Sequence, residues 1–312
     1  MLRIGRYLLL LGFALLTAAP AWSESRIDCS AIKSRVLKQT AHYCVLLPAS
    51  YDSKESKAAK RQYPVLYFLH GLGDNEQTLF KSGGWTLIDD LRQEYKIGEF
   101  LIVAPEGKRS FYINSADGKV PYSDFFLSEF MPYIEGKFRI RPGREGRGIS
   151  GISMGGYGAL HFAFAHPELF SSVSAQSAAL ITQSPQDLNT AEKSHSPLSG
   201  MLAVVFGRPI DVHHWNENDP LVLAKANKAR LRNLAIYFNC GDEDNYRFDE
   251  GAKALHQILD SEGIGHEYHL YPGDHGPEYF FSHFAETMQF HSRVFDSEKP
   301  AGSHAATALG TR

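Results

Sequence analysis

The sequence has few cysteines, no strongly basic tract and, beyond its N-terminus, no long hydrophobic run. Among 312 residues there are only three cysteines, and their spacing is not that of a zinc site. The formal net charge is −3, so neither nucleic acid nor an anionic membrane surface is an expected partner. No segment after the first two dozen residues is apolar for long enough to span a bilayer.

The first 23 residues differ in character from the rest of the chain. Arg3 and Arg6 precede an apolar run over 7–16, small residues follow, and Ala21-Trp22-Ser23 offers a cleavage site. This is the layout of a secretory signal peptide. An uncleaved membrane anchor is the alternative, but the run is shorter than the ~20 residues that a spanning helix needs. Cleavage removes two arginines and no acid, which changes the net charge from −3 to −5. We therefore expect a secreted or periplasmic protein without stable membrane insertion.

The three cysteines have two possible states in an oxidising compartment. Cys29 and Cys44 are close in sequence and could form a disulfide, which would leave Cys240 free. Alternatively, all three are reduced and buried. None of them lies in a motif that would make it a nucleophile.

Apolar segments of two kinds alternate along the chain. Two strands with a turn near 38–40 are expected in 30–48. Further strands are expected at 63–69, 100–104, 146–152, 170–175, 234–239 and 266–271. Helices are expected at 85–95, 122–138, 155–166 and 278–295. This alternation predicts an α/β fold in one domain over 24–296, with a mostly parallel sheet covered by helices on both faces.

Two segments do not follow this alternation. Residues 181–230 are rich in Ser, Asn and Pro and only partly helical, with 221–231 as the clearest helix, which indicates an insertion above the sheet. Residues 297–312 are small and polar without periodicity and are predicted to be a disordered tail.

The strongest chemical signal is Gly151-Ile152-Ser153-Met154-Gly155, which matches G-x-S-x-G. In the nucleophile elbow, a sharp turn between a strand and a helix exposes the serine, and only small flanking residues fit. A strand is expected before Ser153 and a helix after it. Ser150 lacks the final glycine of the motif. The alternative is an ordinary glycine-rich turn with a solvated serine.

A serine nucleophile also needs donors for the developing oxyanion. His70-Gly71-Leu72-Gly73 follows a buried strand directly, and its glycines allow close approach of the backbone to a substrate. The backbone N–H groups of Leu72 and Met154 are the expected donors. A plain strand-to-helix turn is the alternative for this loop.

The acid and the base should follow the serine in chain order, each after a late strand. Asp244 is the favoured acid, Asp242 is second, and Glu243 and Asp249 lie nearby. His275 lies between the last strand and the last helix, where its imidazole can take the serine proton and return it to the leaving group.

The other late histidines have weaker claims. His266, His269, His283 and His291 lie in or beside the last strand and helix, where packing or surface roles are expected. The pair at 213 and 214 has no partner motif, so no metal site is expected. No cofactor is expected either, because a serine nucleophile with its base and acid needs none.

Together these segments resemble the esterase D family, which includes S-formylglutathione hydrolases, feruloyl and acetylxylan esterases, enterochelin-type esterases and mycolyltransferases. The resemblance extends over about 30–295. It rests on the run from Tyr63 to Asp74, the run from Gly151 to Ala159, Trp215 with Asn218-Asp219-Pro220, Gly241-Asp242-Glu243-Asp244, and Pro272-Gly273-Asp274-His275.

The resemblance implies an α/β-hydrolase fold, a Ser153, Asp244 and His275 triad, and oxyanion donors at Leu72 and Met154. It also implies five substrate-binding residues, which are His70, Gly71, Tyr112, Asn114 and Trp215. Tyr112 and Asn114 belong to the segment Phe111-Tyr112-Ile113-Asn114, which is expected near the acyl pocket. For Trp215, a buried structural position is the alternative. Gly276-Pro277 departs from the family pattern after the histidine.

The expected function is carboxylic-ester hydrolysis through an acyl-enzyme, on short acyl, acetyl or feruloyl esters of small molecules or oligosaccharides outside the cytoplasm. The signal peptide argues against the cytosolic substrate of S-formylglutathione hydrolases. One alternative is an acyltransferase that uses the same acyl-enzyme with a sugar alcohol as acceptor. Others are a siderophore-ester or thioester hydrolase, and a degenerate fold kept for binding. Nothing in the sequence predicts an oligomeric state.

Overall fold

The computed structural model describes residues 25–191 and 197–297. The predicted signal peptide and residues 298–312 of the predicted tail lie outside the described residues, whereas Ser297, the first residue of the predicted tail, ends a helix. None of the helices in these two ranges combines the length and the apolar composition that crossing a bilayer requires.

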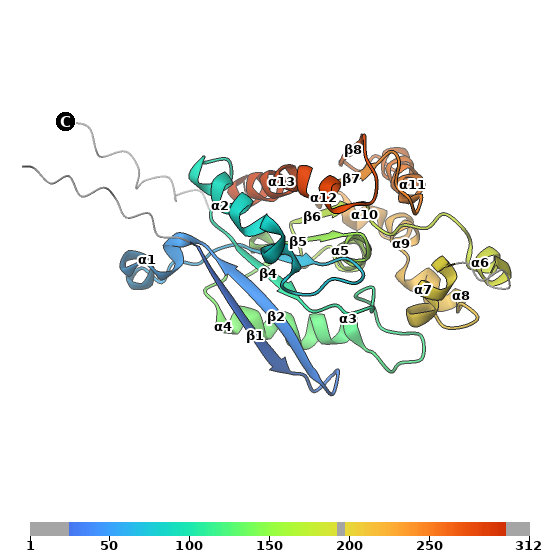
Figure 1. Cartoon of the computed structure of the whole chain (residues 1–312), viewed down its shortest axis with the longest axis horizontal. Helices are drawn as coiled ribbons and strands as arrows, with labels where there is room; N and C mark the ends of the chain where they lie inside the picture. Colours follow the sequence, from blue (N-terminus) through green and yellow to red (C-terminus); the bar gives the residue numbers. More distant parts are fainter. Residues whose placement is uncertain (1–24, 192–196, 298–312) are drawn as a thin grey trace, which may run out of the picture.

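The centre of the fold is an eight-stranded sheet with the order β1-β2-β4-β3-β5-β6-β7-β8 (Figure 1). In this order, each pair of neighbouring strands from β4 to β8 is parallel, whereas β2 is antiparallel to both β1 and β4. This is the mostly parallel sheet that the sequence predicts. Its strands are β1 (Arg26–Lys33), β2 (Thr40–Leu47), β3 (Val65–Leu69), β4 (Leu101–Pro105), β5 (Arg147–Ile152), β6 (Ser172–Gln176), β7 (Ala235–Gly241) and β8 (Glu267–Tyr271).

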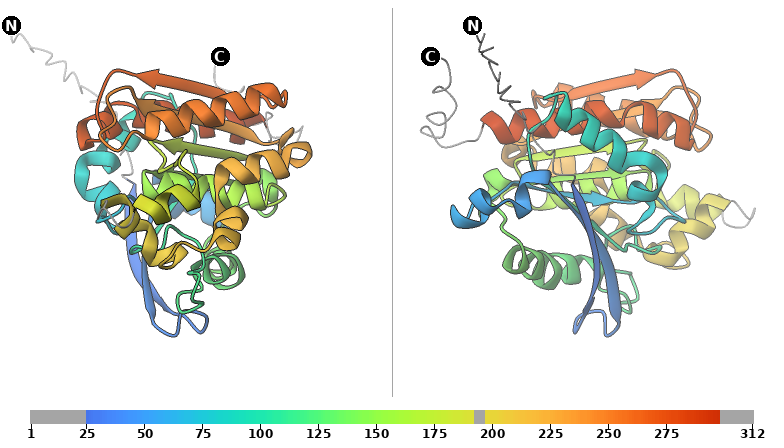
Figure 2. Two further views of the ribbon diagram at one scale, coloured as in Figure 1. Left: turned by 90° about the vertical axis from the view of Figure 1, so that its right-hand side faces the viewer. Right: turned by 60° about the vertical axis from the view of Figure 1, so that its left-hand side comes forward.

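Helices cover both faces of the sheet, as Figures 1 and 2 show. On β3, Val65, Tyr67 and Leu69 belong to one hydrophobic cluster. Leu66 and Phe68 belong to a second cluster on the opposite face. Successive side chains of a strand point to opposite faces, so burial on both sides requires an uninterrupted apolar run. This explains why the sequence of β3 shows no alternation of polar and apolar residues.

The helices that flank the sheet largely follow the predicted positions. A continuous helical stretch over α3, η3 and α4 matches the prediction for 122–138, whereas the predicted closing helix is split at His283 into α12 and α13. The helices flanking the sheet are α1 (Lys54–Ala58), α2 (Trp85–Gln93), α3 (Tyr122–Phe125), α4 (Met131–Lys137), α5 (Met154–Ala165), α11 (Phe248–Ser261), α12 (Pro277–Ser282) and α13 (Phe284–Ser297); the short helical turns are η1 (Ala49–Asp52), η2 (Phe80–Gly84), η3 (Phe126–Phe130) and η4 (Arg144–Gly146).

Helix α11 is absent from the sequence-based prediction. Its buried residues include Phe248, Ala252, Leu255 and Leu259, which have helical spacing. This helical spacing of apolar residues is the sequence pattern that could have predicted α11. Its charged first turn follows the acidic segment at 242–244, where only a loop was expected.

The insertion is more helical than its composition suggests. It contains α6 (Pro185–Ala191), α7 (Pro197–Phe206), α8 (Val212–Asn218), α9 (Pro220–Ala226) and α10 (Lys228–Leu231). Asp211 and Asp219 cap α8 and α9 by accepting hydrogen bonds from backbone N–H groups of the first turn. Helix α9 packs against α5 and α11, so the insertion is joined to the helix that follows Ser153.

Cys29 and Cys44 form a disulfide between β1 and β2, where they are directly opposite each other in the strand register. Of the two states that the sequence allows, the structure therefore has the bridged one. Cys240 is a buried free thiol at the end of β7.

Candidate active site

Ser153 lies in a sharp turn between β5 and α5. Its backbone has a positive φ, with φ 55° and ψ −117°, and this strained conformation is typical of functional positions. A Cβ on Gly151 would collide with the Gly155 carbonyl, and one on Gly155 would collide with the Leu69 carbonyl. The two glycines of the motif are therefore required by close backbone approach.

The structure brings Ser153, His275 and Asp244 together from three loops at neighbouring strand ends. His275 Nε2 lies 2.8 Å from Ser153 Oγ, and His275 Nδ1 lies 2.6 Å from Asp244 Oδ2. Asp244 follows β7, and His275 follows β8 and precedes α12. Carboxyl ends of parallel strands meet at one edge of a sheet, which is why residues 122 positions apart can be hydrogen-bonded.

The carboxylate of Asp244 is completely buried and accepts hydrogen bonds on both oxygens. Oδ1 accepts from the backbone N–H of Tyr246 at 2.9 Å and of Phe248 at 3.4 Å. Burial alone would raise the pKa of Asp244, but the interaction with His275 and these N–H groups outweigh it, so the pKa is lowered. The carboxylate therefore stays charged and can orient the imidazole.

Cys240 makes a further contact to this carboxylate. Its thiol donates to Asp244 Oδ2 at 3.6 Å, the oxygen that also faces His275. Burial raises the pKa of the Cys240 thiol far above its ordinary value, so the sulfur keeps its proton and acts as a donor.

The other acids of the segment do not face His275. Asp242 accepts a hydrogen bond from the backbone N–H of Gly273 at 3.1 Å. Asp249 lies in α11, where its carboxylate pairs with Lys253 at 2.8 Å. Glu243 is exposed. Of the four acids that the sequence offered, the geometry therefore selects Asp244.

The loop after β3 lies against the elbow, because a Cβ on Gly71 would be 3.7 Å from Ser153 Cβ. His70 Nε2 accepts from the backbone N–H of Gly107 at 2.8 Å, so Nδ1 carries the proton and donates to the Gly71 carbonyl at 2.8 Å. Burial lowers the pKa of His70, which keeps this imidazole neutral. His70 thereby holds the Gly71–Leu72 segment next to Ser153.

Several predicted substrate-binding side chains have structural positions instead. Tyr112 has no exposed surface, and its hydroxyl donates to the His70 carbonyl at 3.0 Å. His70 is 3% exposed, so neither side chain offers a surface to a substrate. Trp215 is buried against Phe206, with ring centroids 4.7 Å apart, which matches the buried alternative.

Asn114 also has local partners. Its side-chain amide donates to the Asp124 carboxylate at 3.1 Å and accepts from the Asp124 N–H at 3.2 Å. Its backbone carbonyl accepts from His214 Nε2 at 2.9 Å. Asn114 therefore ties the loop after β4 to α3 and to the insertion.

A second serine–histidine cluster occurs between the sheet and α13. His291 Nδ1 lies 2.7 Å from Ser172 Oγ, and its Nε2 lies 2.8 Å from Ser174 Oγ. All three side chains are completely buried, and burial lowers the pKa of His291 to about 3. Both ring nitrogens are occupied by serines, and the hydrogen bonds of the ring reach no carboxylate. A substrate cannot reach these hydroxyl groups, so the cluster fits the packing role expected for His291.

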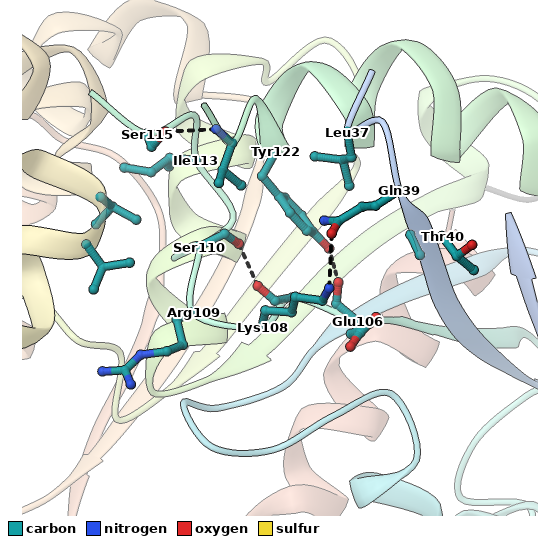
Figure 3. A pocket seen from close by; sticks show the side chains of 15 residues that line it. Leu37, Gln39, Thr40, Glu106, Lys108, Arg109, Ser110, Ile113, Ser115 and Tyr122 are labelled. Carbon is teal, nitrogen blue, oxygen red and sulfur yellow. Dashed lines mark hydrogen bonds between the residues drawn. The ribbon is translucent and has the colours of Figure 1, made fainter. Parts of the chain in front are cut away.

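A cavity of about 290 Å³ is lined by the loop that follows β4 and by residues of β2 and α7 (Figure 3). Its walls include Leu37, Ile113 and Val204, and Lys108 reaches across it to Gln39 at 3.3 Å. The described residues that line it do not include Ser153 or His275. Within 25–191 and 197–297, no three His, Cys, Asp or Glu side chains are grouped as a metal site would require.

With this geometry established, comparison with known proteins identifies the family. Residues 34–291 match the esterase family described as "Putative esterase", and the chain belongs to that family. Its fold is the α/β-hydrolase fold of solved esterases, with Ser153, His275 and Asp244 at the ends of neighbouring strands.

Particular relatives are similar to this chain over most of its length. An acetyl esterase of Caldicellulosiruptor saccharolyticus is 27% identical over 272 residues, which cover 84% of this chain and 97% of that protein. An esterase of Mycobacterium tuberculosis is 30% identical over 249 residues, which cover 74% of this chain but only 51% of the longer relative. A solved ferulic acid esterase superposes with a TM-score of 0.72 at 28% identity, covering 87% of this chain and 99% of that one.

Proposed function

We propose that this protein hydrolyses carboxylic esters through an acyl-enzyme on Ser153. The observation that carries the proposal is the continuous hydrogen-bonded series from Ser153 Oγ through His275 to Asp244, at 2.8 and 2.6 Å. A serine hydroxyl is a weak nucleophile until an adjacent base accepts its proton, and His275 Nε2 is placed to do so.

In the first half-reaction, Ser153 Oγ attacks the ester carbonyl carbon while its proton moves to His275 Nε2. The carbonyl electron pair moves to the oxygen, where the N–H groups of Leu72 and Met154 stabilise the negative charge. The tetrahedral intermediate then expels the alcohol, which takes the proton from His275. Ser153 is left acylated.

In the second half-reaction, water attacks the acyl carbon and gives a proton to His275 Nε2. The new tetrahedral intermediate releases the acid and Ser153 regains its proton from His275. Asp244 stays charged throughout and stabilises the protonated imidazole. Met154 begins α5, so its N–H lacks a partner inside the helix and is available to the oxyanion.

The proposed substrates are short acyl, acetyl or feruloyl esters. Support comes from the similarity to an acetyl esterase and to a ferulic acid esterase, both of which align over most of this chain. Transfer of the acyl group to a sugar alcohol would use the same acyl-enzyme. Identifying the products with and without a sugar acceptor separates the two reactions.

We also propose that the enzyme acts outside the cytoplasm. The signal-peptide-like N-terminus supports this location, as does the Cys29–Cys44 disulfide, because disulfides persist in oxidising compartments. Cell fractionation combined with N-terminal sequencing of the mature protein tests it. Recovery of the protein in the cytoplasm with its N-terminal residues uncleaved would contradict the proposed location.

The decisive experiment compares Ser153→Ala with Ser174→Ala, its matched control in the buried cluster. With p-nitrophenyl acetate as substrate, Ser153→Ala should lower kcat by at least about 10³-fold, as loss of a triad nucleophile does. Ser174→Ala should stay within a few-fold of wild type, and a serine-directed phosphonate should label only proteins that retain Ser153. Full activity of Ser153→Ala, or loss of activity in Ser174→Ala alone, would overturn the assignment.

A further inference from the structure

Three aromatic rings pack against the ring of His275. The ring centroids of Tyr246, Phe248 and Phe280 lie 5.0, 5.3 and 5.1 Å from that of His275, all in edge-to-face geometry. Phe248 is buried, as expected of packing, whereas Tyr246 is 53% exposed. A large aromatic side chain that is half exposed beside the proposed base calls for an explanation beyond packing.

Tyr246 is held firmly in this exposed position. Its ring stacks on the buried Phe248 with centroids 5.4 Å apart and planes inclined by 18°. Its backbone N–H donates to Asp244 Oδ1 at 2.9 Å, so the carboxylate that orients His275 also fixes the tyrosine. One face of the ring packs on Phe248, and the exposed remainder of a rigid ring can bind a flat partner with little loss of conformational entropy.

The order of the strands decides which part of an ester would meet this ring. Ser153 follows β5; the loop with Leu72 follows β3 on one side, and the loops with Asp244 and His275 follow β7 and β8 on the other. The carbonyl oxygen of a bound ester turns toward Leu72. The alcohol oxygen must instead lie at His275 Nε2, because it takes its proton there. The alcohol part of the ester would therefore lie on the His275 side of Ser153, the side on which Tyr246 also lies after β7.

We propose that Tyr246 is a specificity-determining platform on which the sugar ring of an esterified saccharide stacks. This inference rests on the proposed esterase function. A pyranose ring presents a face of C–H groups that is apolar and flat enough to pack on an aromatic ring, while its hydroxyl groups stay in water. A small acyclic alcohol such as ethanol is too short to cover the ring.

The test compares two acetate esters, ethyl acetate and a mono-acetylated methyl xyloside. Both give the same acetyl-enzyme, so a difference between them arises in the steps up to release of the alcohol. The measured quantity is the ratio of kcat/KM for the sugar ester to kcat/KM for ethyl acetate. Tyr246→Ala should lower this ratio roughly two- to tenfold, the range expected for loss of one stacking contact.

Two further variants show whether the ring itself is responsible. Tyr246→Phe keeps the ring and should keep the ratio, with little change in either ester. Tyr95→Ala removes another exposed tyrosine, 85% exposed between α2 and β4, and should leave the ratio unchanged.

The possible results distinguish the role of Tyr246 from the proposed esterase function. Three results would overturn the role of Tyr246 as a platform without contradicting the esterase function. These are an unchanged kcat/KM ratio in Tyr246→Ala, an equal loss of kcat/KM for both esters, and a loss of the ratio in Tyr246→Phe as well. Equal loss would mean that Tyr246 only supports His275, and a shift in the pH profile of both esters would accompany it. Wild-type protein inactive on both esters would overturn the proposed function and the platform together.

Discussion

The buried His291 should make the stability of this protein depend on pH. Burial lowers the pKa of His291 from its ordinary value near 6.5 to about 3, so the folded protein keeps the imidazole neutral where the unfolded chain already binds a proton. The contribution of neutral His291 to the stability of the folded protein is therefore complete above pH 6.5, the pKa of the histidine in the unfolded chain. This contribution is lost as the pH falls from 6.5 toward 3. Between about pH 7.5 and pH 5, this single group should reduce the free energy of unfolding by about 2 kcal/mol.

The assay is urea unfolding of wild type and His291→Gln at both pH values. Glutamine retains hydrogen-bonding groups near Ser172 and Ser174 but does not titrate, so the variant should lose about 2 kcal/mol less than wild type on acidification. His42→Gln, at an exposed position on β2, is the matched control and should behave as wild type. Equal pH dependence in wild type and His291→Gln would refute the reasoning. Because His291 lies outside the proposed triad, kcat/KM per folded molecule at neutral pH should be retained.

Two further predictions concern the acid and the disulfide. Asp244→Asn should lower kcat by about 10³- to 10⁴-fold, because an amide cannot stabilise the protonated His275. Asp242→Asn should lower kcat only a few-fold, since an amide oxygen can still accept a hydrogen bond from the Gly273 N–H. Steady-state kinetics measure kcat for both variants. A larger loss in Asp242→Asn than in Asp244→Asn would mean that Asp242 is the acid. Replacing Cys29 and Cys44 by alanine opens a loop with a sequence separation of 15 residues and should lower the free energy of unfolding by up to about 3 kcal/mol. Urea unfolding measures this loss, and because β1 and β2 lie at the sheet edge remote from β8, kcat should not change; a large loss of kcat would show that the hairpin supports the site.

Much of the fold follows from local patterns. The apolar runs of β3 and β4 are read directly as strands because burial on both faces requires every residue to be apolar. The sharp turn at Ser153 is also predictable from the sequence, because close backbone contacts require glycine at 151 and 155 and the G-x-S-x-G pattern contains both. By contrast, α11 was missed because its polar face is charged and its start adjoins an acidic loop.

The roles of single side chains were less predictable. Tyr112 is buried in the loop after β4 and Trp215 is buried on α8, and the short pattern around each does not show which way its side chain points. The exposed ring of Tyr246 gave no signal in the sequence either. Its stack with Phe248 and its backbone bond to Asp244 are local, but its contact with His275 forms only once the loops after β7 and β8 have packed together.

The sequence by itself determined the class of fold, the G-x-S-x-G turn at Ser153 and the chain order of the proposed serine, acid and base. These follow from periodicity and from glycines that steric contact demands over a few residues. The tertiary structure alone decided that Asp244 rather than Asp242 faces His275, that Cys29 and Cys44 are bridged, and that the cluster around His291 is sealed from substrate. Those choices depend on distances between strand ends and on burial, and such distances exist only after segments far apart in the chain have packed together.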